Sequence, residues 1–154
     1  MDSSAKSRNV LLKPPGQPSL PFVMLLDDDS DIAEMYRLGL QAAGFRVSMF
    51  AEPSDFLVAV ARAVPDIAVL DWRLPGKSGV DVLEELRQNP RTAQLPVFIL
   101  SNFLGDQNGA IDRVFELGAL AWLRKSLTSP DALAQRLKQA IGPTRYGRRE
   151  TDRA

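Results

Sequence analysis

The chain switches between two hydrophobic periods five times, and this alternation limits the folds it can adopt. Short apolar runs typical of strands occupy residues 22–26, 45–50, 67–70, 97–100 and 119–123. Each is followed by a segment with apolar residues at helical spacing, at residues 29–43, 53–63, 80–88, 110–117 and 129–141. Continuous apolar strands are typical of a parallel sheet buried on both faces. Strict strand–helix alternation therefore predicts an α/β fold whose parallel sheet is covered by helices on both sides.

Composition divides the chain into three segments. Residues 1–21 are rich in proline and predict a flexible leader, residues 22–141 form the domain, and residues 142–154 form a basic tail. The formal net charge is zero, but the domain itself carries more acidic than basic residues. This acidic body argues against direct nucleic-acid binding. The tail arginines could contact phosphates, although a solvated tail is the simpler interpretation.

Two residue types are missing, and their absence excludes several chemistries. Without cysteine there can be no disulfide, thiolate zinc site or cysteine nucleophile, and without histidine there is no imidazole acid–base chemistry and no phosphohistidine. No window approaches the roughly 18 apolar residues of a membrane span, and the N-terminus lacks the form of a signal peptide. We therefore expect a cytoplasmic protein without a membrane partner.

Polar residues stand where four of the five predicted strands end. They are Asp27–Asp29 after the first strand, Asp71 after the third, Ser101 and Asn102 after the fourth, and Arg124 and Lys125 after the fifth. Because ligands bind at the carboxyl ends of parallel strands, we expect these groups to meet in one shallow cleft.

Each acidic residue also has a structural interpretation. Asp29 or Ser30 is expected to cap the following helix, which needs only one such residue. The remaining carboxylates would repel each other unless a divalent cation offset their charge. Asp71 is poorly explained as a cap, because Pro75 and Gly76 separate it from the next helix.

The set of residue types suits phosphoryl transfer to a carboxylate. Magnesium prefers oxygen ligands and takes one or two carboxylates together with phosphate oxygens. An aspartate beside such an ion can attack a phosphoryl group, and cations and donors then stabilise the charge on the transferred oxygens. Lys125 and the Ser101 hydroxyl could supply these contacts.

Together these motifs resemble the receiver domains of two-component response regulators. The resemblance covers about residues 22–141 and rests on four segments, namely Leu-Leu-Asp-Asp-Asp at 25–29, Leu-Asp-Trp-Arg-Leu-Pro-Gly at 70–76 with Gly79 opening the next helix, Leu-Ser at 100–101, and Lys125. It implies a flavodoxin-like five-stranded parallel sheet of order 2-1-3-4-5.

The resemblance implies a metal site and a phosphoacceptor. Asp27 and Asp28 match the acidic pair that holds Mg²⁺ or Mn²⁺, with Asp28 the expected direct ligand. Asp71 matches the phosphoacceptor and also contacts the metal, and the backbone carbonyl of Arg73 matches a further ligand.

It also implies residues that respond to the phosphoryl group. Ser101 matches the switch hydroxyl, Lys125 matches the lysine that pairs with a phosphoryl oxygen, and Trp122 stands where the family has a switching Tyr or Phe. For Trp122, plain packing is the alternative. Many receivers have a proline after a cis bond where this chain has Ser126, so the reach of Lys125 depends on the conformation of that bond.

The implied function is a signalling switch rather than an enzyme. The chain would accept a phosphoryl group on Asp71 from a histidine kinase or phosphotransfer protein, as in a phosphorelay, with at most self-phosphorylation from small donors and autodephosphorylation. No output domain follows residue 141, so we expect a stand-alone receiver that acts on a downstream protein target. Phe103, Leu104 and Leu127 could form that contact or pack the loops, and homodimer formation is left open.

Two other functions fit parts of the sequence. Asp27 as nucleophile and Asp29 as general acid would resemble the haloacid-dehalogenase-type phosphatases, but the acidic pair which that family needs after the lysine is missing and Asp71 would have no role. The other alternative is a receiver-like interaction module that is never phosphorylated.

Overall fold

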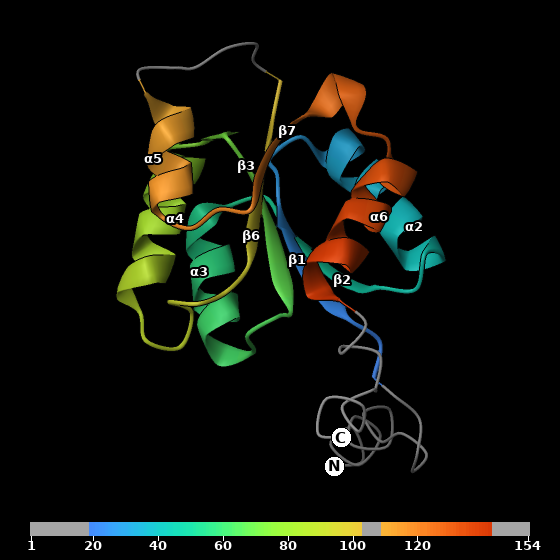
Figure 1. Cartoon of the computed structure of the whole chain (residues 1–154), viewed down its shortest axis with the longest axis horizontal. Helices are drawn as coiled ribbons and strands as arrows, with labels where there is room; N and C mark the ends of the chain where they lie inside the picture. Colours follow the sequence, from blue (N-terminus) through green and yellow to red (C-terminus); the bar gives the residue numbers. More distant parts are fainter. Residues whose placement is uncertain (1–18, 103–108, 143–154) are drawn as a thin grey trace.

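The computed structural model describes residues 19–102 and 109–142. In this part of the chain a single parallel sheet is formed by β1 (Phe22–Leu26), β2 (Arg46–Phe50), β3 (Ile67–Asp71), β6 (Val97–Ser101) and β7 (Ala121–Arg124). The strands lie in the order β2-β1-β3-β6-β7 (Figure 1). Numbered along the chain, this is the order 2-1-3-4-5, so the predicted flavodoxin-like topology is confirmed.

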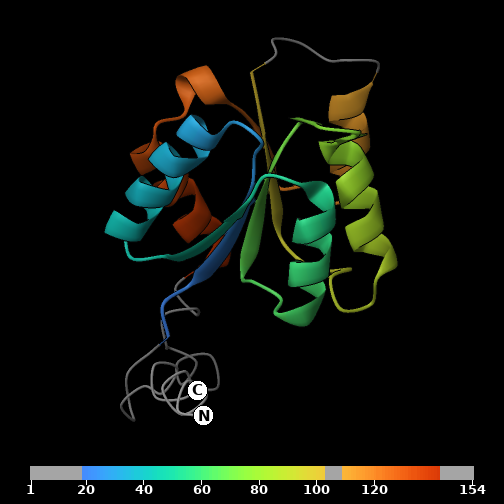
Figure 2. The same cartoon turned by 180° about the vertical axis from the view of Figure 1, so that it is seen from behind.

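Helices cover both faces of the sheet, as predicted. Helices α2 (Ser30–Ala42) and α6 (Pro130–Ile141) lie on one face. Helices α3 (Pro53–Arg62), α4 (Gly79–Gln88) and α5 (Ala110–Glu116) lie on the other (Figures 1 and 2). Each layer buries its own apolar cluster against the sheet, with Leu40 and Leu137 in the first and Phe56 and Leu83 in the second.

Burial explains why the central strands are apolar throughout. All five residues of β3 and all five of β6 are buried, because helices pack on both faces of these strands. The edge strand β2 has no buried residue and alternates polar with apolar side chains. Because β3 and β6 pair with each other inside the sheet, their last residues, Asp71 and Ser101, are held at neighbouring positions.

The structure adds local elements that the sequence patterns do not predict. After β3 the chain forms a small antiparallel pair, β4 (Arg73–Leu74) and β5 (Lys77–Ser78), closed by a turn in which Gly76 has a φ of 74°. Because this φ is unfavourable for other residues, the turn favours glycine. A 3₁₀ turn, η1 (Lys125–Leu127), follows β7.

Two strands begin later than predicted, for the same reason. The amide of Phe45 donates to the Leu40 carbonyl, and the amide of Ala119 donates to the Val114 carbonyl. Both residues therefore complete the end of the preceding helix rather than open the strand. The predicted strands at 45–50 and 119–123 are observed at Arg46–Phe50 and Ala121–Arg124.

Some predictions concern residues outside this description. Residues 1–18 of the expected leader, residues 143–154 of the expected tail, and Phe103 and Leu104 lie outside the described residues. Within the described ranges, no helix combines the length and apolar character needed to cross a membrane.

Candidate functional site

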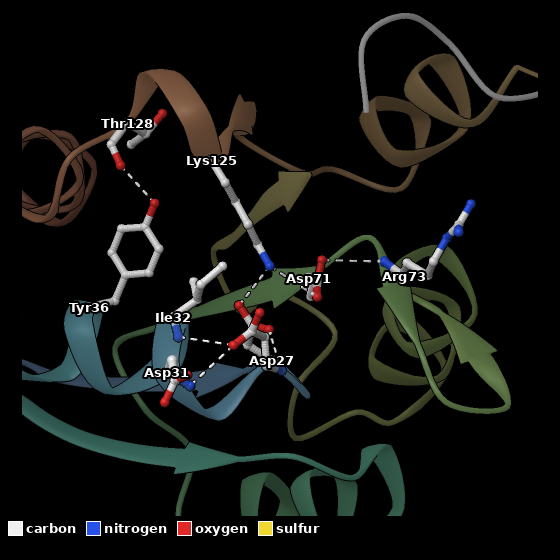
Figure 3. Close-up of polar contacts among 9 residues, drawn as sticks. Asp27, Asp31, Ile32, Tyr36, Asp71, Arg73, Lys125 and Thr128 are labelled. Atoms are coloured by element: carbon white, nitrogen blue, oxygen red, sulfur yellow. Dashed lines mark hydrogen bonds and ion pairs between the residues drawn. The ribbon is translucent and has the colours of Figure 1, made fainter. Parts of the chain in front are cut away.

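The carboxyl ends of the strands bring the predicted site residues together. Leu26, the last residue of β1, pairs with Leu70 of β3, so Asp27 and Asp71 follow at neighbouring positions of the sheet. Asp71 pairs with Leu100, which places Ser101 one residue further along β6. Figure 3 shows Asp27 and Asp71 close to each other beneath Lys125.

Three carboxylates form a compact cluster at this edge. Asp27, Asp28 and Asp71 each offer an oxygen that lies within 4.8 Å of the others. Asp27 and Asp71 are buried, whereas Asp28 is exposed to solvent. The cluster is therefore anchored in the core and open on one side.

The third consecutive aspartate has a different role. The Asp29 carboxylate accepts hydrogen bonds from the backbone amides of Asp31 and Ile32, at 3.1 and 3.2 Å, and caps α2. Of the two predicted caps, Asp29 rather than Ser30 is the one observed. The backbone amide of Asp29 also donates to Asp27 Oδ1 at 3.0 Å, which holds that carboxylate in place.

Lys125 reaches two of the three carboxylates from η1. Its Nζ atom lies 2.8 Å from Asp27 Oδ2 and 3.2 Å from Asp71 Oδ2. The Lys125 side chain is 5% exposed, so both ion pairs are shielded from water. The described residues contain no cis peptide bond, so Lys125 makes these contacts with a trans bond to Ser126.

For both Asp71 and Lys125, burial and the opposite charge of the ion-pair partner shift the pKa in opposite directions. Burial raises the pKa of Asp71 to about 6, with Lys125 opposing the shift and Asp27 adding to it. Burial lowers the pKa of Lys125, but its pairs with Asp27 and Asp71 outweigh this effect and the pKa is raised. The cluster thus contains three carboxylates and one ammonium, which pairs with two of them, so it keeps an excess of negative charge.

The donor set fits a hard divalent cation. Two oxygens on opposite sides of Mg²⁺ stand about 4.2 Å apart, so carboxylates within 4.8 Å of one another need only a small shift to share one ion. Asp27 Oδ2 is buried and, apart from its ion pair with Lys125, makes no hydrogen bond to a residue that the structure describes. The exposed side at Asp28 leaves room for the water ligands that Mg²⁺ retains.

Arg73 and Ser101 lie where the sequence places them. The backbone amide of Arg73, two residues after the end of β3, donates to Asp71 Oδ1 at 3.4 Å. The metal contact of the Arg73 carbonyl stays a prediction. Ser101 ends β6 and is fully buried, opposite Arg124 in the sheet.

Trp122 contacts an aromatic residue that sequence reasoning did not single out. Its ring is centred 5.3 Å from the ring of Trp72, with the two planes inclined at 45°. Both rings are partly buried and pack on the apolar cluster beneath α3 and α4. This contact connects β7 directly to the residue that follows Asp71.

The comparisons with known proteins agree on one family. A family model described as the response regulator receiver domain matches residues 23–138. The phosphate regulon transcriptional regulatory protein PhoB of Rhizobium meliloti is 29% identical over 116 residues, which cover 75% of this chain and 50% of that protein. The chain thus spans about half the length of this relative and of the similar PhoB and GltR proteins of Pseudomonas aeruginosa.

Solved structures match over most of the described chain. A putative response regulator from Chloroflexus aurantiacus superposes with a TM-score of 0.71 at 31% identity, covering 79% of this chain and 98% of that one. The chemotaxis response regulator CheY4 of Vibrio cholerae gives a TM-score of 0.70 at 24% identity, covering 80% of this chain and 99% of that one, and supports the fold alone.

Proposed function

This chain belongs to the response-regulator receiver family of two-component systems, and from that premise we propose that it is a switch operated by phosphorylation of Asp71. The phosphoryl group would come from the phosphohistidine of a histidine kinase or of a phosphotransfer protein. Output would follow from binding to a downstream protein target.

The observation that carries this proposal is the environment of Asp71. Its carboxylate ends a central strand, lies within 4.8 Å of two further carboxylates and is paired with a buried ammonium. In the proposed transfer an Asp71 oxygen forms a bond to phosphorus while the phosphorus–nitrogen bond of the phosphohistidine breaks. The imidazole nitrogen keeps the electron pair of that bond and takes up a proton.

A divalent cation would be held by the same carboxylates. Asp27, Asp28 and Asp71, with the Arg73 backbone carbonyl, are the proposed ligands for Mg²⁺ or Mn²⁺. When bound, the ion would neutralise charge that builds up on the phosphoryl oxygens. Asp27 and Asp28 would hold the ion, and Lys125 would pair with a phosphoryl oxygen.

Two further residues would detect the phosphoryl group. The Ser101 hydroxyl stands at the end of the strand beside Asp71, where a short movement would allow it to donate to a phosphoryl oxygen. Trp122, on the neighbouring strand, would transmit that movement to the surface. The contact between Trp122 and Trp72 also connects Trp122 to the residue that follows Asp71.

The proposed role is that of an acceptor rather than an enzyme. The reactions we propose for the chain itself are at most self-phosphorylation from small donors and autodephosphorylation. The acidic character of residues 22–141 favours protein partners over nucleic acid for this domain. We propose that it works in the cytoplasm, where kinases would present their phosphohistidine.

The hydrogen bonds of Asp29 argue against the phosphatase alternative. A general acid would have to reach the leaving group, but the Asp29 carboxylate is engaged by two backbone amides of α2. Asp27, the nucleophile of that alternative, is less exposed than Asp71, at 2% against 7%.

Incubation with acetyl phosphate and Mg²⁺ tests the proposal. Intact-mass measurement should show one added phosphoryl group on the wild-type chain and none on Asp71→Asn. As a matched control, Asp112→Asn removes an exposed acid on α5 and should be labelled like the wild type. Equal labelling of Asp71→Asn would refute the assignment. Turnover of small phosphate esters that is lost in Asp27→Asn would support the phosphatase instead.

A further inference from the structure

Tyr36 joins α2 to the turn that carries Lys125. The side chain is fully buried between the sheet and α6, and its hydroxyl donates a 2.7 Å hydrogen bond to the backbone carbonyl of Thr128, 92 residues further along the chain (Figure 3). Apolar packing alone would be served by phenylalanine. The hydroxyl is therefore used to hold a particular segment of backbone.

Thr128, at the end of the turn, forms hydrogen bonds to the backbone at the start of the turn. Its Oγ1 donates to the Arg124 carbonyl at 2.7 Å, just before η1. Its backbone amide donates to the Lys125 carbonyl at 3.3 Å. One residue thus binds the two backbone carbonyls that flank the Lys125 α-carbon, and Tyr36 fixes that residue relative to α2.

Within residues 19–102 and 109–142, the turn has few other contacts that constrain it. Ser126 stands where many receivers have a proline, so this backbone keeps its ordinary conformational freedom before folding. Leu127 is 70% exposed and adds little packing. Besides the ion pairs of Lys125 itself, the hydrogen bonds of Tyr36 and Thr128 are the contacts in the described part of the chain that define the turn's geometry.

The N-terminus of α2 lies at the acidic cluster. Asp29 caps the helix directly after Asp27 and Asp28, and Tyr36 lies about 10 Å further along the helix axis. The start of α6 also lies against α2, since a Cβ on Gly39 would stand 2.3 Å from the Pro130 side chain. A single rigid helix thus sets the distance between the acids and the lysine turn.

We propose that Tyr36 is a positioning residue for Lys125. Its hydroxyl, acting through Thr128, holds η1 so that the Lys125 ammonium stands over Asp27 and Asp71. The link to phosphoryl transfer rests on the function proposed above. The placement of Lys125 over the two acids does not depend on it.

Tyr36→Phe and Thr128→Val test this role, since each removes a hydroxyl while keeping the bulk of the side chain. Lys125 reactivity is measured in metal-free protein by limited acetylation and peptide mapping, with Lys77 and Lys138 as internal references. Both variants should raise the relative reactivity of Lys125. The maximal rate of phosphorylation by acetyl phosphate should fall about two- to tenfold, as expected for one lost hydrogen bond. The half-saturating Mg²⁺ concentration should not rise, because a displaced Lys125 competes less strongly for Asp27 and Asp71.

Leu40→Val is the matched control, because it trims a fully buried side chain of the same helix without touching the turn. It should leave both the reactivity ratio and the rate unchanged at temperatures where all variants are folded. Unchanged Lys125 reactivity in Tyr36→Phe, or an equal response in Leu40→Val, would overturn the positioning role. If Lys125 reactivity responds as expected but the wild type takes no phosphoryl group, the proposed function fails and the positioning role stands.

Discussion

Lys125 and Asp27 form an ion pair in which the ammonium lies 2.8 Å from a buried carboxylate oxygen that has no other hydrogen-bond partner among the described residues. In metal-free protein, this lysine is the one cation with an ion pair to the cluster among the described residues. Stability and metal binding should therefore be coupled through Lys125.

Lys125→Met should destabilise the metal-free protein by about 3–5 kcal/mol, since it leaves buried carboxylates without their counter-ion. Added Mg²⁺ should recover more stability in this variant than in the wild type, because the ion replaces the missing charge. Urea unfolding in EDTA and in Mg²⁺ measures both effects. Lys77→Met removes a lysine from an exposed pair with Glu85 and should change stability by at most about 1 kcal/mol. Similar losses in the two variants would contradict the coupling.

The pH dependence of the free energy of unfolding should reflect the protonation of Asp71. Its pKa rises from 3.8 to about 6 on folding, so between these values the folded state binds more protons than the unfolded state. The free energy of unfolding of metal-free protein should thus fall as pH rises from 4 to 6, then level off. A tenfold difference in proton affinity corresponds to about 1.4 kcal/mol, so the total fall should be about 1–3 kcal/mol after allowance for solvent screening and for the interaction with Lys125.

Asp71→Asn should remove this part of the pH profile. Unfolding curves collected at several pH values in EDTA provide the measurement. A variant profile with the same slope as the wild type between pH 4 and 6 would show that another group is responsible.

Gly79 allows α4 to approach the acceptor. A Cβ at this position would lie 2.7 Å from the backbone oxygen of Asp71 and 3.3 Å from the Cα of Trp72. Gly79→Ala should therefore cost about 1–3 kcal/mol despite the better helix propensity of alanine, and it should slow phosphorylation by displacing Asp71. Ser78→Ala removes the cap of the same helix and should cost about 1 kcal/mol with a normal phosphorylation rate. A stable, fully active Gly79→Ala would contradict the steric argument.

Asp28 should affect metal affinity more than stability, because it is the exposed member of the cluster. Asp28→Asn should weaken Mg²⁺ binding by about tenfold or more, followed through the emission of Trp72 and Trp122. Asp31→Asn removes a nearby exposed acid in the first turn of α2 and should leave the affinity close to that of the wild type. Equal affinities for Asp28→Asn and the wild type would exclude Asp28 as a ligand.

The sequence predicted the sheet and its polar edge because both follow from local patterns. The apolar runs at β3 and β6 are buried on both faces, and such strands can be recognised from composition alone. The order of the strands came from the family resemblance. The gathering of Asp27, Asp71 and Lys125 then followed from a geometric rule about where parallel strands end.

Other features depend on contacts between distant residues and left no local signal. Tyr36 fitted the apolar stripe of its helix, and only the structure shows its hydroxyl bonded to Thr128. The choice of Asp29 over Ser30 as cap depends on the path of the chain after β1. In the sequence, the only feature that pointed to Tyr36 was its polar hydroxyl at an otherwise apolar position of the helical pattern.

The site of phosphorylation itself provides the most direct test. After reaction with acetyl phosphate and Mg²⁺, borohydride reduction converts an aspartyl phosphate to homoserine, which peptide mass spectrometry can locate. Homoserine at position 71, absent without Mg²⁺, is the predicted result. Homoserine at position 27 or 28, or unmodified aspartate at position 71 in a chain that has gained a phosphoryl group, would contradict the account.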